Sequence, residues 1–190
     1  MENKFGFVSL SGRTNVGKST LLNAFFQKKI AITSRKPQTT RNRILGILTE
    51  EKSQIVFLDT PGVHLGYKRQ LNKVMNKIAS HCYEEVDLVL FLIDRFKWQK
   101  EEENILKSLK NLNKPVVLVI NKIDRLRDKT KLLAFIKDIS EKFNFLSIVP
   151  ISALKKDNLM ELKSVILNNL EIGPYHFPED SLTEFSDNFF

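Results

Sequence analysis

A loop suited to binding phosphate is predicted between Gly12 and Ser19. Its residues follow the pattern G-x-x-x-x-G-K-[ST], come directly after a short apolar run, and lead into a helix expected over residues 19–27. In such loops the backbone N–H groups surround phosphate oxygens, and the helix N-terminus adds partial positive charge. A chance glycine-rich turn is the alternative, which the strand before the loop and the helix after it disfavour. The residues of this loop and helix start that are predicted to bind the nucleotide are Gly12, Arg13, Thr14, Asn15, Val16, Gly17, Lys18, Ser19 and Thr20.

Three side chains in and after this loop carry the predicted phosphate and metal chemistry. We expect Lys18 to reach the β- and γ-phosphates of a nucleotide and the Ser19 hydroxyl to bind Mg²⁺. Thr40 lies in a polar loop, residues 36–43, that has no apolar periodicity. We expect Thr40 to bind Mg²⁺ when the γ-phosphate is present, as in an order–disorder switch, and a flexible polar loop is the alternative.

A second short motif, or box, is Asp59-Thr-Pro-Gly62, which follows the predicted strand 54–58. A carboxylate at the C-terminal edge of a sheet can hold Mg²⁺ through a water, and the Gly62 N–H can meet the γ-phosphate. An ordinary Pro-Gly turn is the alternative for this box taken alone. The predicted nucleotide contacts here are Asp59, Thr60, Pro61 and Gly62; the predicted metal ligands are Ser19, Thr40 and Asp59; and the predicted catalytic residues are Lys18, Thr40 and Gly62.

Two boxes near the end of the chain are suited to recognising guanine. Asn121-Lys-Ile-Asp124 follows an apolar strand, and Asp124 can accept from the two donors on the Watson–Crick edge of guanine. Adenine lacks that pair of donors, so such a site can discriminate by about 10⁴-fold. We expect the aliphatic stem of Lys122 to lie along the base and Asn121 to tie the loop back, and a capped helix start is the alternative. Ser152 and Ala153 follow the last strand, where the Ala153 N–H can reach guanine O6.

Strands and helices must alternate to bring these boxes together. Near-continuous apolar runs predict strands at residues 5–10, 44–48, 54–58, 87–93, 115–120 and 146–149. Apolar stripes of helical period predict further helices around residues 71–82, 105–112, 132–143 and 159–170. The alternation predicts an α/β fold, a P-loop NTPase three-layer sandwich with a six-stranded, mostly parallel sheet and one antiparallel strand. We expect this domain to occupy residues 1–172, followed by a linker over 173–190.

Composition limits the kind of protein. The chain has 190 residues, of which 42% are hydrophobic and 27% charged, so a soluble globular domain is expected. No apolar run approaches the ~18 residues of a membrane span, and the N-terminus does not resemble a secretory signal. One cysteine excludes an internal disulfide and a cysteine-rich zinc site. The net charge is +8, and residues 3–49 contain no Asp or Glu, which favours polyanionic partners such as nucleotides, RNA or an acidic membrane surface.

The sequence resembles the Era family of bacterial GTPases. The residues that carry the resemblance are Gly12–Asn23, Ile32–Ile47, Asp59–His64 and Gly173–Asp180. The resemblance implies a GTP- and GDP-binding, Mg²⁺-dependent GTPase that acts on the small ribosomal subunit and its RNA. Family members carry a C-terminal KH domain that clamps RNA, and we expect this chain to stop before such a domain. We further expect a cytoplasmic monomer with peripheral contact at the inner membrane.

The rate of hydrolysis is open at this stage. Many GTPases place a water-orienting Gln directly after the Asp59-Thr-Pro-Gly62 box, whereas this chain has Val63. We therefore expect slow intrinsic hydrolysis, and a nucleotide-dependent RNA- or ribosome-binding module with negligible hydrolysis is the alternative. Asn15 matches the position used to bind K⁺ in similar GTPases that lack the glutamine, so K⁺ is a predicted further cofactor.

Overall fold

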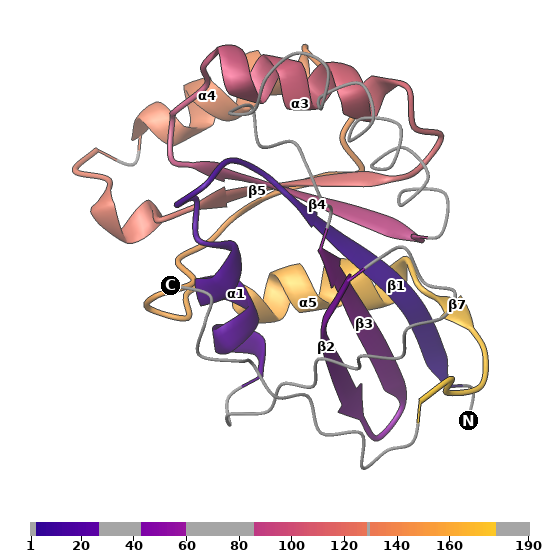
Figure 1. Cartoon of the computed structure of the whole chain (residues 1–190). Helices are drawn as coiled ribbons and strands as arrows, with labels where there is room; N and C mark the ends of the chain where they lie inside the picture. The colour runs from indigo at the N-terminus through magenta and orange to yellow at the C-terminus, as the bar shows by residue number, and fades with distance from the viewer. Residues whose placement is uncertain (1–2, 27–42, 60–85, 129, 178–190) are drawn as a thin grey trace.

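A computed structural model describes residues 3–26, 43–59, 86–128 and 130–177 of the chain (Figure 1). Within these ranges strands and helices alternate, with polar loops between them. The elements are β1 (Lys4–Ser11), α1 (Lys18–Phe25), β2 (Arg43–Glu50), β3 (Ser53–Asp59), β4 (Leu88–Asp94), α3 (Lys100–Lys110), β5 (Val116–Asn121), the 3₁₀ turn η1 (Ile123–Arg125), α4 (Thr130–Ser140), β6 (Ser147–Pro150), α5 (Leu159–Asn168) and β7 (Glu171–Ile172).

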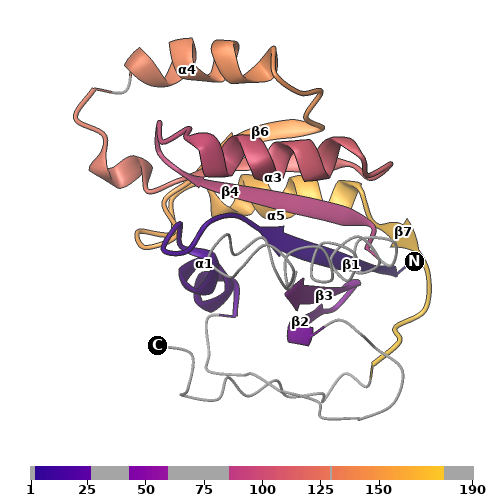
Figure 2. The same cartoon turned by 45° about the horizontal axis from the view of Figure 1, so that its top comes forward.

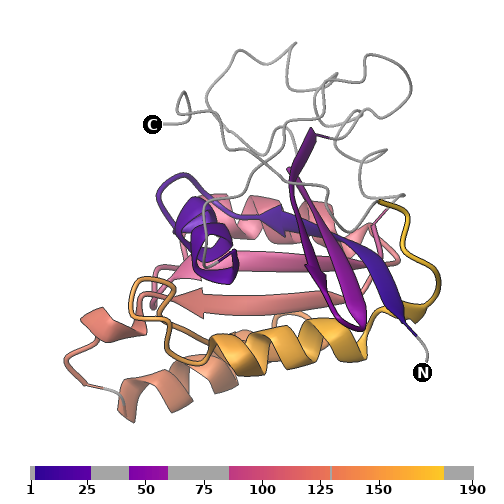
Figure 3. The same ribbon diagram turned by 90° about the horizontal axis from the view of Figure 1, so that it is seen from below.

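The strands form one mixed sheet in the order β2-β3-β1-β4-β5-β6. Every neighbouring pair on this path is parallel except β2–β3, which is an antiparallel hairpin at one edge (Figure 3). Short β7 pairs antiparallel with the start of β1, and the two lie side by side in Figures 1 and 2. Because parallel strands run the same way, the loops that follow β1, β4, β5 and β6 leave the sheet at a common edge.

Helices cover both faces of the sheet, so successive residues of the central strands enter two different cores. Leu88, Leu90 and Leu92 of β4 join a cluster with residues of α1 and α5, whereas Val89 and Phe91 join a second cluster with α3 and α4. Figure 1 shows these two helix pairs on opposite sides of β4 and β5. A strand buried on both faces reads as a continuous apolar run, which is why the sequence shows no alternation there.

The predicted fold class is confirmed: three layers, a mostly parallel sheet, and one antiparallel edge strand. The six predicted strands are all present, and the two-residue strand β7 was not predicted. The helix predicted over residues 71–82 lies outside the described residues. In the ranges described, none of the helices has the length and apolar character that crossing a membrane requires.

The described part of the predicted linker, residues 173–177, forms neither helix nor strand and lies against the sheet. The Gly173 N–H donates to the Asn3 carbonyl at 2.9 Å, and the His176 ring stacks on Phe5 with centroids 4.1 Å apart. The buried Gln54 side chain on β3 holds both backbone groups of Phe177, accepting from its N–H at 3.1 Å and donating to its carbonyl at 3.0 Å. The division into residues 1–172 and 173–190 stays a prediction.

Candidate nucleotide site

The phosphate-binding loop is a tight turn between β1 and α1 that depends on two glycines. Gly12 and Gly17 have φ values of 143° and 104°, a left-handed region that disfavours side chains. A Cβ on Gly12 would lie 2.4 Å from the Leu92 carbonyl oxygen, and one on Gly17 would lie 2.2 Å from Asn121 Nδ2. Gly12 therefore lets the loop approach β4, and Gly17 lets it approach Asn121 at the end of β5.

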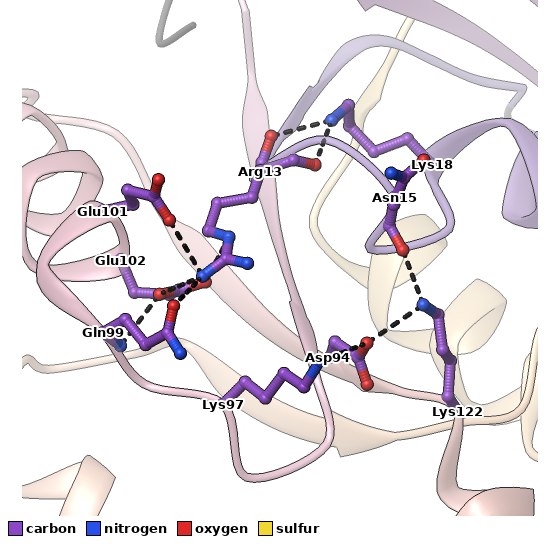
Figure 4. A network of polar contacts seen from close by, with 10 residues as sticks. Arg13, Asn15, Lys18, Asp94, Lys97, Gln99, Glu101, Glu102 and Lys122 are labelled. Atoms are coloured by element: carbon purple, nitrogen blue, oxygen red, sulfur yellow. Dashed lines mark hydrogen bonds and ion pairs between the residues drawn. The ribbon is translucent and has the colours of Figure 1, made fainter. Parts of the chain in front are cut away.

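Lys18 points into the turn of this loop. Its ammonium donates to the carbonyl oxygens of Gly12 and Arg13, both at 2.7 Å, as Figure 4 shows. The exposed residues of the loop and the first helical turn are Thr14, Asn15, Ser19 and Thr20. The Val16 side chain is 2% exposed and packs in the core, so only its backbone N–H is suited to contact a phosphate, and that contact stays a prediction.

The Arg13 side chain is bound at the start of α3, and its predicted contact with the nucleotide stays a prediction. Its guanidinium turns away from the loop toward the start of α3, where it donates to Gln99 Oε1 at 2.5 Å (Figure 4). It also pairs with Glu101 at 2.9 Å and with the buried Glu102 at 3.4 Å. Glu102 in turn accepts from the Gln99 N–H, so the same carboxylate closes the first turn of α3 and anchors the loop. The Arg13 side chain is thus a structural tether of the loop.

Asn121, at the end of β5, connects three parts of the site. Its side chain is buried, and its Nδ2 donates to the Val16 carbonyl at 2.8 Å. Its Oδ1 accepts from the Lys122 N–H at 2.8 Å and from the Ala153 N–H at 3.0 Å. Asn121 thereby joins the phosphate-binding loop, its own loop and the loop after β6. The predicted contact between the Ala153 N–H and guanine stays a prediction, since in this structure that N–H is bonded to Asn121.

Asp124 has a fixed carboxylate on the exposed 3₁₀ turn η1. Its Oδ1 accepts from the Ser152 hydroxyl at 2.6 Å, and that hydroxyl accepts from the Lys155 N–H at 3.1 Å. Ser152 is fully buried, so its hydroxyl is fixed and holds the Asp124 carboxylate from the protein side. Ser152 was predicted as a site residue only because it follows the last strand. The hydrogen bond shows that its hydroxyl orients the Asp124 carboxylate.

Lys122 extends from the loop after β5 to the phosphate-binding loop. Its ammonium donates to the Asn15 carbonyl at 2.5 Å and to Asp94 Oδ2 at 3.0 Å (Figure 4). Asp94 ends β4 and also accepts from Arg95 Nε at 2.8 Å. Burial by itself raises the pKa of the Asp94 carboxyl, but the hydrogen bonds from Arg95 and Lys122 outweigh it and lower that pKa below its ordinary value. Asp94 was not among the predicted residues, although it is polar and directly follows an apolar strand, as Asp59 and Asn121 do.

Two of the three predicted metal ligands, Thr40 and the Asp59 side chain, lie outside the described residues. Asp59 ends β3 beside Leu10, but its side chain lies outside the described residues, as do Thr40, Thr60, Pro61 and Gly62. Among the residues described there is no group of three His, Cys, Asp or Glu side chains that could hold a metal. Mg²⁺ commonly binds through one or two protein oxygens together with phosphates and water, and the exposed Ser19 hydroxyl beside Lys18 fits that mode.

Comparison with known proteins agrees with this geometry. Residues 7–122 match the family described as 50S ribosome-binding GTPase. Over 184 residues the chain is 50% identical to the GTPase Era of Haemophilus influenzae strain PittGG, which covers 97% of this chain and 61% of that protein. The chain therefore spans about three fifths of the length of this curated relative.

Two solved structures of Era superpose well on the chain. One is Era in complex with MgGDPNP and nucleotides 1506–1542 of 16S ribosomal RNA, with a TM-score of 0.80 and 44% identity over 97% of this chain and 63% of that one. The other is a variant of Aquifex aeolicus Era bound to GDP and AlF₄⁻, with a TM-score of 0.79 and 44% identity over 96% of this chain and 62% of that one.

The contact between Gly17 and Asn121 yields a stability prediction. A Cβ at residue 17 would lie 2.2 Å from Asn121 Nδ2, so Gly17→Ala must displace the Asn121 amide as well as strain the backbone. We expect a loss of roughly 1–3 kcal/mol in the free energy of unfolding, measured by urea denaturation. Gly173→Ala is the matched control, because nothing lies within 4 Å of the added Cβ. Equal stability of the two variants would contradict the proposed role of the close contact between Gly17 and the Asn121 amide.

Proposed function

The chain belongs to the 50S ribosome-binding GTPase family, and we propose that it binds GTP and GDP with Mg²⁺ and hydrolyses GTP to GDP and phosphate. The observation that carries the proposal is the buried Asn121 amide, which joins the phosphate-binding loop to the two loops suited to guanine. The nucleotide complexes of the Era structures support the same assignment. A site assembled in this way can read the base and the phosphates of one nucleotide together.

The residues predicted to carry the chemistry have the following roles in this proposal. Asp124 accepts from the guanine donors, held by Ser152, while Lys122 lies along the base. Ser19 and Thr40 hold Mg²⁺ directly and Asp59 holds it through water, and the ion neutralises charge on the β- and γ-phosphates. Lys18 and the Gly62 N–H act on the γ-phosphate. Hydrolysis is slow because Val63 cannot orient the attacking water.

The proposed partner is the small ribosomal subunit and its RNA. The Era complex with a segment of 16S ribosomal RNA supports this choice over a large-subunit partner, despite the description of the family. We infer a GTP-driven switch in the assembly of that subunit, acting in the cytoplasm as a monomer. The net charge of +8 supports a peripheral contact with the anionic inner membrane, which cell fractionation tests.

Replacement of Asp124 tests the choice of nucleotide. Asp124→Asn offers an N–H donor where guanine also presents donors, so GTP affinity should fall by about 10²-fold or more and affinity for xanthosine triphosphate should rise. Titration calorimetry with the two nucleotides measures both effects. Asp128→Asn is the control, since Asp128 is an exposed carboxylate on the same loop that bonds only to Thr130 among the contacts described. Unchanged GTP affinity in Asp124→Asn would refute the assignment.

Potassium should stimulate hydrolysis through Asn15. This residue is exposed in the phosphate-binding loop, so its side chain is accessible to a cation beside the phosphates. A cation there would stabilise charge that develops in the transition state, and we expect about tenfold faster phosphate release in KCl than in NaCl. Asn15→Ala should remove the difference between the two salts. Equal turnover of the unaltered chain in both salts would contradict this role.

Binding of RNA by this chain alone should be weak and steeply dependent on salt. The acid-free stretch of residues 3–49 contains nine Lys and Arg residues. Three of them have side chains that the structure describes, and all three are held within the domain: Lys4 by the Leu167 carbonyl, Arg13 at the start of α3, and Lys18 by its own loop. We expect a dissociation constant of about 10⁻⁴–10⁻⁶ M at physiological salt, equal for the 3′ end of small-subunit RNA and for a scrambled RNA. Strong preference for the true sequence would show that this domain reads RNA itself.

A further inference from the structure

Asp94 occupies the point where the two halves of the site meet. It is the last residue of β4, in register with Asn121 on β5, and its side chain is 14% exposed. Its Oδ2 accepts from the Lys122 ammonium, which also bonds to the Asn15 carbonyl of the phosphate-binding loop. Lys122 thus bridges the base-binding loop and the phosphate-binding loop, and Asp94 is the counter-charge at the middle of that bridge (Figure 4).

The carboxylate of Asp94 is itself rigidly held. Arg95 has a left-handed φ of 52°, donates from Nε to Asp94 Oδ1, and donates from its N–H to the Asn121 carbonyl at 3.0 Å. The Lys97 N–H donates to the Asp94 carbonyl at 2.9 Å, which closes the turn after β4. The Lys97 ammonium lies 3.7 Å from Oδ2, farther than that of Lys122. A carboxylate fixed on both sides can fix the direction of the lysine that it binds.

We propose that Asp94 is a positioning residue for guanine nucleotide binding, which acts by holding the Lys122 ammonium at the Asn15 carbonyl so that the lysine stem lies flat beside the base. The proposal rests on the function proposed above. Asp94 need not touch the nucleotide. Its effect passes through Lys122, whose long side chain would otherwise sample many rotamers and lose that order on each binding event.

The sign of the effect distinguishes positioning from simple charge. A nucleotide is an anion, so removing a carboxylate from its surroundings would by itself strengthen binding. If Asp94 works through Lys122, neutralising it weakens binding instead. The loss should appear as faster dissociation of the nucleotide, because the lysine that covers the base is no longer held.

A double-mutant cycle in the 190-residue chain tests the proposal. Asp94→Asn removes the charge with little change of shape, and Lys122→Met keeps the apolar stem while removing the ammonium. Titration calorimetry with GDP and stopped-flow dissociation of a fluorescent GDP analogue are the measurements. Glu103→Gln is the matched control, since Glu103 also pairs with a lysine, Lys142, and the other described partner of its carboxylate is Trp98 rather than a residue of either loop. Thermal unfolding without nucleotide checks that each variant is folded.

We expect Asp94→Asn to bind GDP about tenfold more weakly than the unaltered chain, and to change the affinity by less than about twofold when Lys122 is already Met. Glu103→Gln should bind GDP like the unaltered chain. Equal losses in both backgrounds would overturn the proposal, because they would mean that Asp94 supports the fold independently of Lys122. Unchanged or tighter binding by Asp94→Asn would overturn it too.

If Asp94→Asn does not fold, Asp94→Glu is a second variant that tests the proposal. It retains the carboxylate one methylene farther out and should keep GDP affinity within about threefold of the unaltered chain. A loss of tenfold or more in folded Asp94→Glu that is equally large when Lys122 is Met would overturn the proposal, because the effect would then not pass through Lys122. Failure of the unaltered chain to bind GDP at all would instead refute the proposed function, so the two failures are distinguishable.

Discussion

The buried side-chain amide of Asn121 is the interaction on which the candidate site depends. It uses both ends of the amide, donating to the Val16 carbonyl and accepting from the N–H groups of Lys122 and Ala153. A buried polar group left without a partner costs about 1–3 kcal/mol, so separating any of the three loops from Asn121 is unfavourable. The amide fits only because Gly17 has no side chain in the same space. One residue therefore fixes how far the phosphate-binding and base-binding loops lie from each other.

The sheet explains why polar groups converge around this amide. Strands β4 and β5 are buried on both faces, so their residues are apolar until the chain leaves the core at the strand end. Ser11, Asp94, Asn121 and Pro150 close β1, β4, β5 and β6 at the same edge. The boxes are far apart in sequence, yet their backbones are neighbours in adjacent strands. Because these strands are parallel, the loops that follow them lie at one edge of the sheet, where their side chains and backbone groups can contact one ligand.

Much of the fold and part of the site could be predicted because the signals are local. Continuous apolar runs marked the strands, and the glycine pattern marked the phosphate-binding loop. Side-chain partners far apart in sequence could not be predicted. The pairing of the Arg13 side chain with Glu102 was not predicted, and Asp94 was missed although it pairs with Lys122. Charged residues of these types are common on surfaces, and only the strand order brings these particular pairs together. Strand β7, with two residues, is too short to show any periodicity.

Contacts at the other end of the strands limit how the site can respond to its ligand. β1 and β3 are paired in parallel from Lys4 and Ser53 to Leu10 and Asp59. At the start of that ladder the buried Gln54 binds both backbone groups of Phe177, and the Tyr175 hydroxyl donates to the Glu50 carbonyl at 2.8 Å. Residues 173–177 thereby hold the β2–β3 hairpin beside β1, at the end of the sheet away from the phosphate-binding loop. Sliding β3 along β1 would break both the ladder and the contacts of residues 173–177, so any movement on ligand binding costs least when it is confined to the loops at the opposite edge.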